Sequence, residues 1–344
     1  MRQPALTRLM MVLTALLLSG LASAVAAQDT CAPPNIRTDV RPGPADGPTE
    51  VTVGTYVVDL RGIDDVEQTI TLDIALRMRW TDPRLADWEG CRLALADIWY
   101  PMLFLRNSGR IFMRWPQTVS VEEGGQVTYL QRGAGTFSSY HSLRTFPFDV
   151  QDISLRFFPL NWTKPKVSLV ADPEYSGIAP VLNISDWQVL DYATVVGAQT
   201  LETTGKTHAT YDMVLTLKRY SGYYVHKIML PIALIVIMSW MVFWIDAREF
   251  GTQLGLSATA VLTMIAFIFA TTNLLPRLGY FTLLDRYIAV ATVFVFAALL
   301  QCLATGYLAT QGRKGTAHRI DVLSRIVFPV VFTGLCITFF WRLI

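Results

Sequence analysis

The sequence is poor in charge, histidine and cysteine, and these scarcities exclude several classes of function. Only 16% of the 344 residues are charged and the net charge is +2, with no basic stripe interleaved with aromatic residues, which argues against a nucleic-acid partner. The 4 histidines show no metal-ligand spacing, and the chain lacks a glycine-rich phosphate loop and a nucleophile elbow. We therefore expect no enzyme activity, no cofactor and no bound metal.

Hydrophobic residues, by contrast, make up 52% of the chain, which is too many for an ordinary soluble enzyme and points to a two-part organisation. At the start of the chain, Arg2 and Arg8 precede an apolar run at 9–21, and small residues follow at 24–27. This order is typical of a secretory signal peptide. We predict a signal peptide over residues 1–27, cleaved near Gln28, which places the mature amino terminus outside the cytoplasm.

Residues 28–222 are predicted to form an exported domain of β-strands. Short stretches alternate apolar and polar residues at 51–60, 70–80, 127–132, 153–158 and 211–218, with no long helical pattern between them. Turn clusters at 123–125 and 132–135 separate some of these stretches. The pattern indicates an antiparallel, immunoglobulin-like β-sandwich of about ten strands. The segment 31–48, rich in Pro, Asp and Gly, is expected to be an irregular or mobile arm.

Residues 223–344 are predicted to form a membrane domain of four helices, at about 223–245, 250–275, 283–311 and 319–341. Their apolar stretches approach the ~20 residues that a helix needs to cross the hydrocarbon core. With the amino terminus outside, four crossings return the carboxyl terminus to the outside. The loop between the last two helices then lies inside, and this region carries Arg313, Lys314, Arg319 and Arg325, as the positive-inside rule expects. Pro231 in the first helix is tolerable where neighbouring helices satisfy the carbonyl that it frees.

The 4 cysteines divide between the two parts of the chain. Cys31 and Cys91 lie in the exported part, where oxidation is permitted, so they form either a disulfide or two unpaired thiols. Cys302 and Cys336 fall in apolar helical runs, and we interpret them as small core or lipid-facing residues.

The second apolar helix gathers polar and small residues on one face. On a helix that advances about 100° per residue, the following side chains fall within about 40° of one line: Gly255, Thr259, Leu262, Ala266, Phe269 and Asn273. If several copies surrounded an axis, Thr259 and Asn273 would offer dipoles to hydrated ions, and Leu262 and Phe269 would form constrictions that gate by dewetting. The alternative is that the polar groups bond their own backbone or a neighbouring helix, and that the small residues mark helix packing.

Several short motifs, each weak alone, occur in an order and spacing that are highly specific. They are WTDPRL at 80–85, IWYP at 98–101, FPFD at 146–149, GYY at 222–224, SW at 239–240 with FWI at 243–245, and NLLPRL at 273–278. From about residue 51 to its end, the chain resembles the pentameric ligand-gated ion channels, that is, the Cys-loop receptors and their bacterial relatives. The resemblance implies an exported ligand-binding sandwich and a four-helix membrane domain whose second helix lines a central pore.

The resemblance further implies a bacterial homopentamer, surrounded by lipid in the inner membrane, with its amino-terminal domain and carboxyl terminus in the periplasm. Ser139 and Ile153 stand where animal receptors carry the two cysteines of their signature loop, and bacterial members lack that bridge. The inner loop 312–318 is short, whereas animal receptors carry a long insert there.

In this family a small-molecule agonist binds between adjacent subunits. The resemblance carries over principal-side positions at Arg106, Leu160, Trp162, His208 and Tyr211, and complementary-side positions at Arg77 and Arg132. Many relatives place an aromatic box here for a cationic amine, but this chain has Arg106 and His208 where aromatics are common. Because an arginine fork suits a planar carboxylate, we hypothesise a carboxylate-bearing agonist. The alternative is that Arg77 and Arg132 pair with acids such as Asp73 or Glu122.

The resemblance places the coupling between the two domains at their junction. The residues implied are Asp64, Asp65, Phe146, Pro147, Phe148, Asp149, Arg219 and Pro276. An acid on the 146–149 turn near Arg219, partly shielded from water, is the expected salt-bridge hub. The simpler interpretation is that the apolar residues of this turn only pack the fold.

Ion selectivity depends on the inner mouth of the pore, where two interpretations compete. Residues 255–264 resemble the pore helix of glycine receptors, which are anion-selective, but the Pro-Ala-Arg signature before it is replaced by Gly251, Thr252 and Gln253. Glu249 lies about a turn further in and would form an acidic ring that favours cations. We therefore predict a cation-selective ligand-gated channel, with an anion-selective channel or a non-conducting membrane sensor as alternatives. A transporter is disfavoured, because the apolar stretches have no interior charge.

Overall fold

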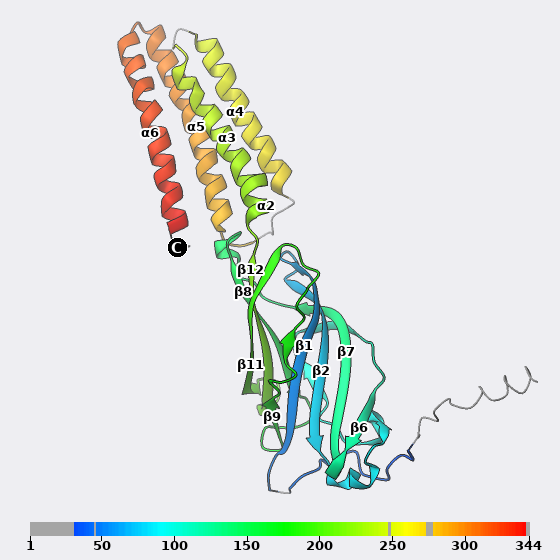
Figure 1. Cartoon of the computed structure of the whole chain (residues 1–344). Coiled ribbons are helices and arrows are strands. Elements are labelled where there is room, and N and C mark those ends of the chain that lie inside the picture. Colours follow the sequence, from blue (N-terminus) through cyan, green and yellow to red (C-terminus); the bar gives the residue numbers. More distant parts are fainter. Residues whose placement is uncertain (1–30, 45, 247–248, 273–277, 342–344) are drawn as a thin grey trace, which may run out of the picture.

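The structure is a computed structural model that describes residues 31–44, 46–246, 249–272 and 278–341 (Figure 1). The predicted signal peptide, Asn273 and Pro276 lie outside the described residues. The described chain has two parts that follow one another along a common long axis, strands up to Arg219 and helices from Gly222. The fold class expected from the sequence, a β-sandwich followed by four apolar helices, is confirmed.

The larger sheet has the order β10-β1-β2-β7-β6-β3, with β9 also paired to β1 and β5 to β7. Its strands are β1 (Thr49–Asp64), β2 (Thr69–Thr81), β3 (Arg92–Ala94), β5 (Ser108–Met113), β6 (Thr118–Glu122), β7 (Gln126–Ser138), β9 (Val167–Ala171) and β10 (Gly177–Ile178). Side chains alternate between the two faces of a strand, so Ile74, Met78 and Trp80 of β2 enter the core while Arg77 and Arg79 lie on the opposite face.

The smaller sheet has the order β11-β12-β8-β4. Its strands are β4 (Leu103–Leu105), β8 (Val150–Pro159), β11 (Trp187–Leu201) and β12 (Lys206–Arg219). Short 3-10 turns complete the domain at η1 (Pro83–Trp88), η2 (Leu95–Asp97), η3 (Glu123–Gly125) and η4 (Leu143–Thr145). Residues of both sheets pack into one apolar core, which includes Trp99, Phe137 and Tyr211.

Residues 132–135 do not form the expected turn, because they lie inside strand β7. A Cβ atom on Gly135 would come within 2.6 Å of the Arg110 carbonyl oxygen of β5, and one on Gly133 within 2.8 Å of Ile111 Cγ2. These glycines therefore allow a close approach of two strands. The other expected turn exists as η3, where Gly124 and Gly125 have φ of 71° and 77°.

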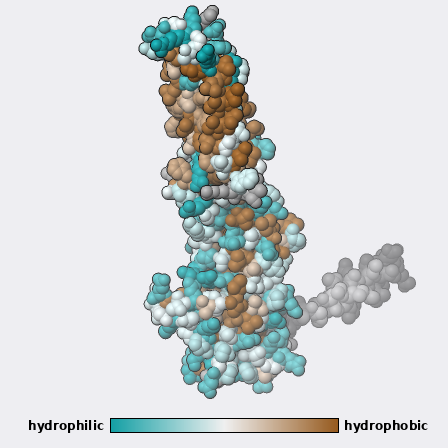
Figure 2. Space-filling model, turned by 90° about the vertical axis from the view of Figure 1, so that its left-hand side faces the viewer, coloured by the Kyte–Doolittle hydropathy of each residue, from teal (hydrophilic) through white to brown (hydrophobic). Residues whose placement is uncertain are grey.

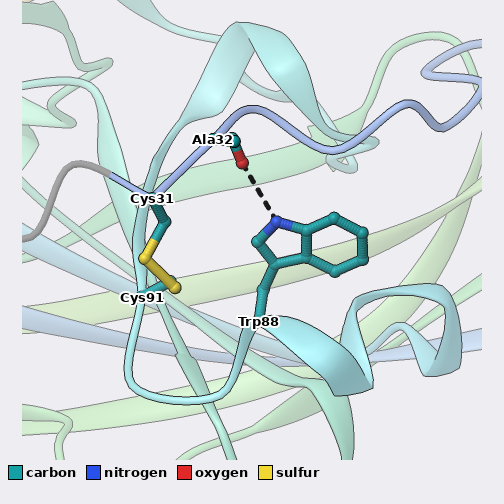
Figure 3. The surroundings of a disulfide bond; sticks show 4 residues. All are labelled: Cys31, Ala32, Trp88 and Cys91. Atoms are coloured by element: carbon teal, nitrogen blue, oxygen red, sulfur yellow. Dashed lines mark hydrogen bonds between the residues drawn. A yellow bond between two sulfur atoms is a disulfide. The ribbon is translucent and has the colours of Figure 1, made fainter.

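The segment before β1 has no helix or strand at its described positions, but it is attached to the sandwich. Cys31 forms a disulfide with Cys91, and the Trp88 indole beside it donates a hydrogen bond of 3.0 Å to the Ala32 carbonyl (Figure 3). Further along, the Arg84 guanidinium donates to the Arg37 carbonyl at 3.1 Å. The arm is thus irregular, and it is held to the sandwich at these points.

Within the described residues, four helical spans are long and apolar enough to cross a membrane. The first combines α2 (Gly222–Tyr224), a π-helical turn η5 (Val225–Met229), α3 (Leu230–Trp240) and a 3-10 turn η6 (Met241–Trp244); the others are α4 (Phe250–Thr271), α5 (Leu283–Thr310) and α6 (Lys314–Phe340). The π turn ends two residues before Pro231, and the Tyr287 hydroxyl of α5 donates to the Met229 carbonyl at 2.9 Å. A neighbouring helix therefore satisfies a carbonyl of the turn that precedes the proline.

The helices are arranged with α5 in contact with α3, α4 and α6, while α3 also packs against α4. Helices α4 and α6 stand on opposite sides of the group (Figure 1). Figure 2 shows a hydrophobic band along the helices that ends in a hydrophilic cap at the tip farthest from the sandwich. Helix α6 begins at Lys314 rather than at residue 319, so helix occupies part of the expected inner loop.

Candidate functional site

One buried cation, Arg219 at the end of β12, organises the junction between the sandwich and the helices. Its Nε and Nη2 donate to Asp149 Oδ1 and Oδ2 at 2.9 and 3.1 Å. Its Nη1 and Nη2 donate to Asp65 Oδ2 and Oδ1 at 2.7 and 2.9 Å. The Arg219 side chain is only 2% exposed. It therefore ties together the β1–β2 loop, the 146–149 turn and the strand that leads into the first helix.

The surroundings of Arg219 favour the charged forms of Arg219 and Asp65. Burial alone would lower the pKa of Arg219, but the hydrogen bonds to Asp149 and Asp65 outweigh burial and raise the pKa. Burial alone would raise the pKa of Asp65, but its interactions with His141 and Arg219 outweigh that effect and lower the pKa. The Trp187 ring also lies 4.0 Å from the guanidinium carbon of Arg219, in cation–π contact.

The turn formed by residues 146–149 connects this ion cluster to the helices. The Phe146 ring meets Tyr224 of α2 with 4.6 Å between centroids, and the Phe146 carbonyl accepts the Leu284 N–H of α5 at 3.2 Å. The Phe148 ring lies 5.7 Å from that of Phe340 at the end of α6. Pro147 between them is buried. The apolar residues of the turn pack the fold, and the same turn holds Asp149 against Arg219.

Asp64 lies in the loop that the resemblance places at the junction, but it does not bind Arg219. Its Oδ1 accepts the N–H groups of Val66 and Glu67 at 2.9 Å each, so Asp64 closes the turn between β1 and β2 while its neighbour faces Arg219. His141 lies at the junction without having been predicted there, with its Nδ1 3.7 Å from Asp65 Oδ1. Tyr280, at the end of the linker 276–280 that the resemblance places at the junction, accepts the Leu143 N–H with its hydroxyl at 3.1 Å.

Helix α4 leaves one face uncovered by the other helices. Its exposed side chains include the five described residues of the predicted face: Gly255, Thr259, Leu262, Ala266 and Phe269. Its buried side chains are Gln253, Ser257, Ala260, Met264 and Thr271, which lie on the opposite side. Leu262 and Phe269 are 68% and 74% exposed. The Thr259 hydroxyl donates to the Gly255 carbonyl at 2.8 Å, so it bonds its own backbone while remaining on the uncovered face.

Glu249 immediately precedes α4, whose amino end lies at the tip of the molecule far from the sandwich (Figure 1). Its side chain is exposed and makes no capping hydrogen bond to the helix. If α4 lined a pore, this carboxylate would therefore be available at the inner mouth.

The positions expected on the principal side of the agonist site differ in their access to solvent. Arg106 and Leu160 are exposed, and Trp162 is half-buried with its ring 5.9 Å from that of Trp99. His208 is buried, and its Nδ1 lies 2.9 and 2.8 Å from the carbonyl oxygens of Pro159 and Trp162. It therefore ties β12 to the end of β8 and to the loop that follows it.

Tyr211 lies fully inside the sandwich core, which corrects its expected contact with a ligand. Its hydroxyl is 3.1 Å from Ser176 Oγ, and its ring packs beside Phe157 of β8. The side chain points inward because of the alternation along β12, so it is not presented at the surface of the described protomer.

Arg77 and Arg132 both occupy the outer face of the larger sheet, and a buried acid binds each of them. Arg77 Nε and Nη2 lie 3.0 and 2.5 Å from Asp172 Oδ2, which also accepts from Arg79 at 3.1 Å. Arg132 Nε and Nη2 lie 2.9 and 3.1 Å from Asp73, and this hydrogen bonding raises the pKa of Arg132. In the protomer, Arg77 and Arg132 are therefore paired with acids, as in the second of the two interpretations of the sequence. Asp172 is a partner that the sequence did not suggest.

The described residues contain no group of three or more His, Cys, Asp and Glu side chains that could hold a metal ion. The candidate functional site has three parts: the ion-paired junction around Arg219, the uncovered face of α4, and the surfaces of the sandwich that carry arginines.

Comparison with known protein families gives two matches, and the boundary between them falls near the junction between the sandwich and the helices. Residues 35–225 match the neurotransmitter-gated ion-channel ligand binding domain, and residues 228–316 match the neurotransmitter-gated ion-channel transmembrane region. The first of these matches alone covers more than half of the chain.

Several individual proteins are also similar. The gamma-aminobutyric acid receptor subunit gamma-1 of Homo sapiens is 29% identical over 302 residues, which cover 81% of this chain and 62% of that protein. The gamma-aminobutyric acid receptor subunit rho-1 of Homo sapiens is 29% identical over 296 residues, which cover 80% of this chain and 60% of that protein. The proton-gated ion channel of Gloeobacter violaceus is 27% identical over 311 residues, which cover 89% of this chain and 84% of that protein. The chain thus spans less than two thirds of the length of the receptor subunits that it matches.

Proposed function

The chain belongs to the neurotransmitter-gated ion-channel family, and from this premise we propose that it is a ligand-gated ion channel. In this proposal the protein is a homopentamer, and a small molecule bound between exported domains opens a pore lined by α4. The observation that carries the proposal is the uncovered face of α4, on which Gly255 and Thr259 accompany Leu262 and Phe269. Copies of α4 around an axis would enclose this face and bring its polar groups to water.

The junction supports a route from the sandwich to the helices. Arg219 holds Asp65 and Asp149, while the turn that carries Asp149 contacts α2, α5 and α6. A displacement of the strands on agonist binding would therefore reach three helical spans through the same turn. Because interfaces of this kind are bistable rather than continuously deformable, a small shift can favour a second arrangement of the helices.

Current recording from the reconstituted full-length protein tests this function directly. A panel of amino acids, amines and organic acids, applied over a range of pH and calcium concentration, is expected to include at least one condition that evokes discrete channel openings. An intact, correctly inserted protein that conducts under none of these conditions would instead support a non-conducting membrane sensor.

We further propose that the pore selects cations, because the Glu249 carboxylate is exposed at the amino end of α4. A ring of carboxylates at this mouth would concentrate cations and repel anions. Reversal potentials in asymmetric salt measure the selectivity. Glu249→Gln should reduce cation preference and Glu249→Asp should retain it, whereas an anion-selective reversal potential in the wild type would favour the alternative channel.

For the agonist, we propose a small molecule with a carboxylate group. The gamma-aminobutyric acid named in two of the relatives carries such a group, and this chain exposes Arg106 on the sandwich surface. A ligand carboxylate at Arg77 would have to share that guanidinium with Asp172. Agonist responses of Arg77→Ala and Arg106→Ala distinguish the two positions. Responses to a carboxylate agonist that both variants leave unchanged would remove the support for this ligand class.

The proposed location is a bacterial inner membrane, with the sandwich and the carboxyl terminus in the periplasm. The proposed orientation is supported by Arg313, Lys314 and Arg319 at the amino end of α6, which lies far from the sandwich, since positive charge favours the cytoplasmic side. Reporter fusions at the carboxyl terminus measure this orientation. Activity of a reporter that functions only in the periplasm is expected.

A further inference from the structure

His141 is a buried histidine at the junction, and neither nitrogen of its imidazole has a hydrogen-bond partner among the described residues. Its side chain is 0% exposed, and it lies between β7 and η4. An unpaired polar group inside a protein is costly, so a buried imidazole normally has a partner. Asp65 is the one acid within ion-pair distance of this imidazole in the described part of the chain, with 3.7 Å between Nδ1 and Oδ1.

The backbone on both sides keeps His141 close to Asp65. Gln68, in the loop between β1 and β2, has a φ of 53°, which is rare for a residue other than glycine. Three hydrogen bonds hold it in place. Its side-chain amide donates to the Asp65 carbonyl at 2.8 Å, its Oε1 accepts the His141 N–H at 2.7 Å, and its carbonyl accepts the Ser139 N–H at 2.8 Å. The imidazole and the carboxylate are therefore neighbours whatever their charges.

The ion cluster beside His141 contains more negative than positive charge. One guanidinium, that of Arg219, faces the two carboxylates of Asp65 and Asp149, whose side chains are 14% and 1% exposed. The three groups together carry one uncompensated negative charge, which is unfavourable in a place shielded from water. Asp65 Oδ1 accepts a hydrogen bond from Arg219 Nη2, and a carboxylate oxygen has a second lone pair for another donor.

The other titratable groups of the junction are exposed or engaged elsewhere; they are Asp64, Glu67, Arg144, Tyr224 and Tyr280. Asp64 accepts N–H groups of its own loop, and the Tyr280 hydroxyl accepts the Leu143 N–H. Tyr224 packs against the Phe146 ring. Glu67 and Arg144 are exposed. A positive charge on His141 would therefore meet Asp65 first.

We propose that His141 is a proton-binding site of the junction. Imidazole is the side chain whose charge normally changes between pH 5 and 8. A proton taken up from solvent brings the cluster of His141, Asp65, Asp149 and Arg219 to zero net charge. A closure of about 1 Å then makes a charge-assisted hydrogen bond from Nδ1 to Asp65 Oδ1. The segment before η4 is thereby tied to the β1–β2 loop by an ionic contact, and mild acid strengthens the connection between the sandwich and the helices.

Thermal unfolding of the purified full-length protein between pH 8 and pH 5.5 tests the proposal without agonist or current. A protein that binds a proton more tightly when folded gains stability as the pH falls. Relative to His141→Gln, the wild-type unfolding midpoint should rise by about 3 °C over this range, the scale expected for one charge-assisted contact. His226→Gln should follow the wild type, because His226 is exposed and its imidazole contacts the Gly222 carbonyl. In an Asp65→Asn background, His141→Gln should have no further pH-dependent effect.

A second measurement keeps the proposal testable if His141→Gln does not fold. Deuterium exchange of the imidazole C2 hydrogen, followed by mass spectrometry, reports proton binding at each histidine of the intact chain. The exchange profile of His141 should have its midpoint at higher pH in the wild type than in Asp65→Asn, while the midpoint of His226 should be the same in both.

Three results would overturn the proposal. The first is a constant difference in unfolding midpoint between the wild type and His141→Gln across the pH range, or a difference of opposite sign in acid. The second is a His141 exchange midpoint that Asp65→Asn leaves unchanged. The third is an equal shift of the His141 and His226 midpoints, which would show a general effect of the lost charge rather than a contact between Asp65 and His141.

Discussion

Arg219 and Asp149 are joined by two hydrogen bonds, at 2.9 and 3.1 Å, although 70 residues separate them in the sequence. Their side chains are 2% and 1% exposed. Arg219 ends the last strand before the helices, and Asp149 ends the turn that packs against them. The pair therefore couples the two domains, because neither domain can shift at this point without moving a buried ion pair.

Removal of one partner of this pair should be costly. Asp149→Asn leaves the Arg219 charge buried with only Asp65 as its counter-ion, and breaking a buried pair in this way typically costs ~3–5 kcal/mol. We expect a lower thermal unfolding midpoint and a loss of agonist-evoked current. Asp152→Asn is the matched control, since Asp152 is exposed and its carboxylate accepts a hydrogen bond from the Thr216 hydroxyl rather than from a buried arginine. Equal effects of the two variants would contradict a special role for the pair.

The stability of the junction should fall in acid because of Asp65. Its pKa is lower in the folded protein than in the unfolded chain, so its ionised form contributes stability that is complete above the unfolded pKa of ~3.9. That contribution is lost as the pH falls from about 4 through the lower folded pKa. Unfolding midpoints measured as a function of pH should therefore drop more steeply for the wild type than for Asp65→Asn. Glu67→Gln, an exposed acid of the same loop, should keep the steep profile of the wild type.

Truncation of Leu262 should favour the open channel. In the proposed pentamer, Leu262→Ala widens an apolar ring that closes the pore by dewetting. Agonist-free open probability should rise about tenfold, since ~1.4 kcal/mol is enough for that change. Single-channel recording measures it. Leu256→Ala makes the same truncation about 120° around the helix, and a similar rise in that variant would show that the effect does not arise from a pore-facing ring.

The bond between Cys31 and Cys91 should stabilise the exported domain by attaching the irregular arm. It closes a loop of 60 residues, and removal of such a disulfide costs ~2–5 kcal/mol. Double replacement, Cys31→Ala with Cys91→Ala, should lower the unfolding midpoint and abolish its sensitivity to reductant. Cys336→Ala, which changes a free thiol in α6, should leave that sensitivity intact.

The features that were predictable from sequence are those that depend on local periodicity. The alternation of β2 and the 100° advance of α4 determine which side chains share a face, and both faces occur in the structure as expected. The change from strands to helices is equally local, because composition changes near Gly222. A helix long enough to cross a membrane can also be recognised in the sequence, because it is a continuous apolar run.

Contacts between distant residues could not be inferred in this way. Asp172 binds Arg77 across 95 residues, and no local pattern pairs them. Asp64 and Asp65 are adjacent and chemically identical, so only the geometry of the loop decides which carboxylate meets Arg219. Gly133 and Gly135 resemble turn residues, but the approach of β5 explains them. Tyr211 is a polar-tipped aromatic whose inward direction follows from the pairing of β12.

The most direct test of the account is the accessibility of α4 to a charged thiol reagent during current recording. Leu262→Cys places a thiol on the uncovered face, and Met264→Cys places one on the buried face of the same helix. The wild type, with Cys302 and Cys336 free, measures background modification. We predict that the reagent irreversibly alters the current through Leu262→Cys and not through Met264→Cys or the wild type. Modification of Met264→Cys alone, or current that the reagent leaves unchanged in Leu262→Cys, would contradict a pore lined by this face.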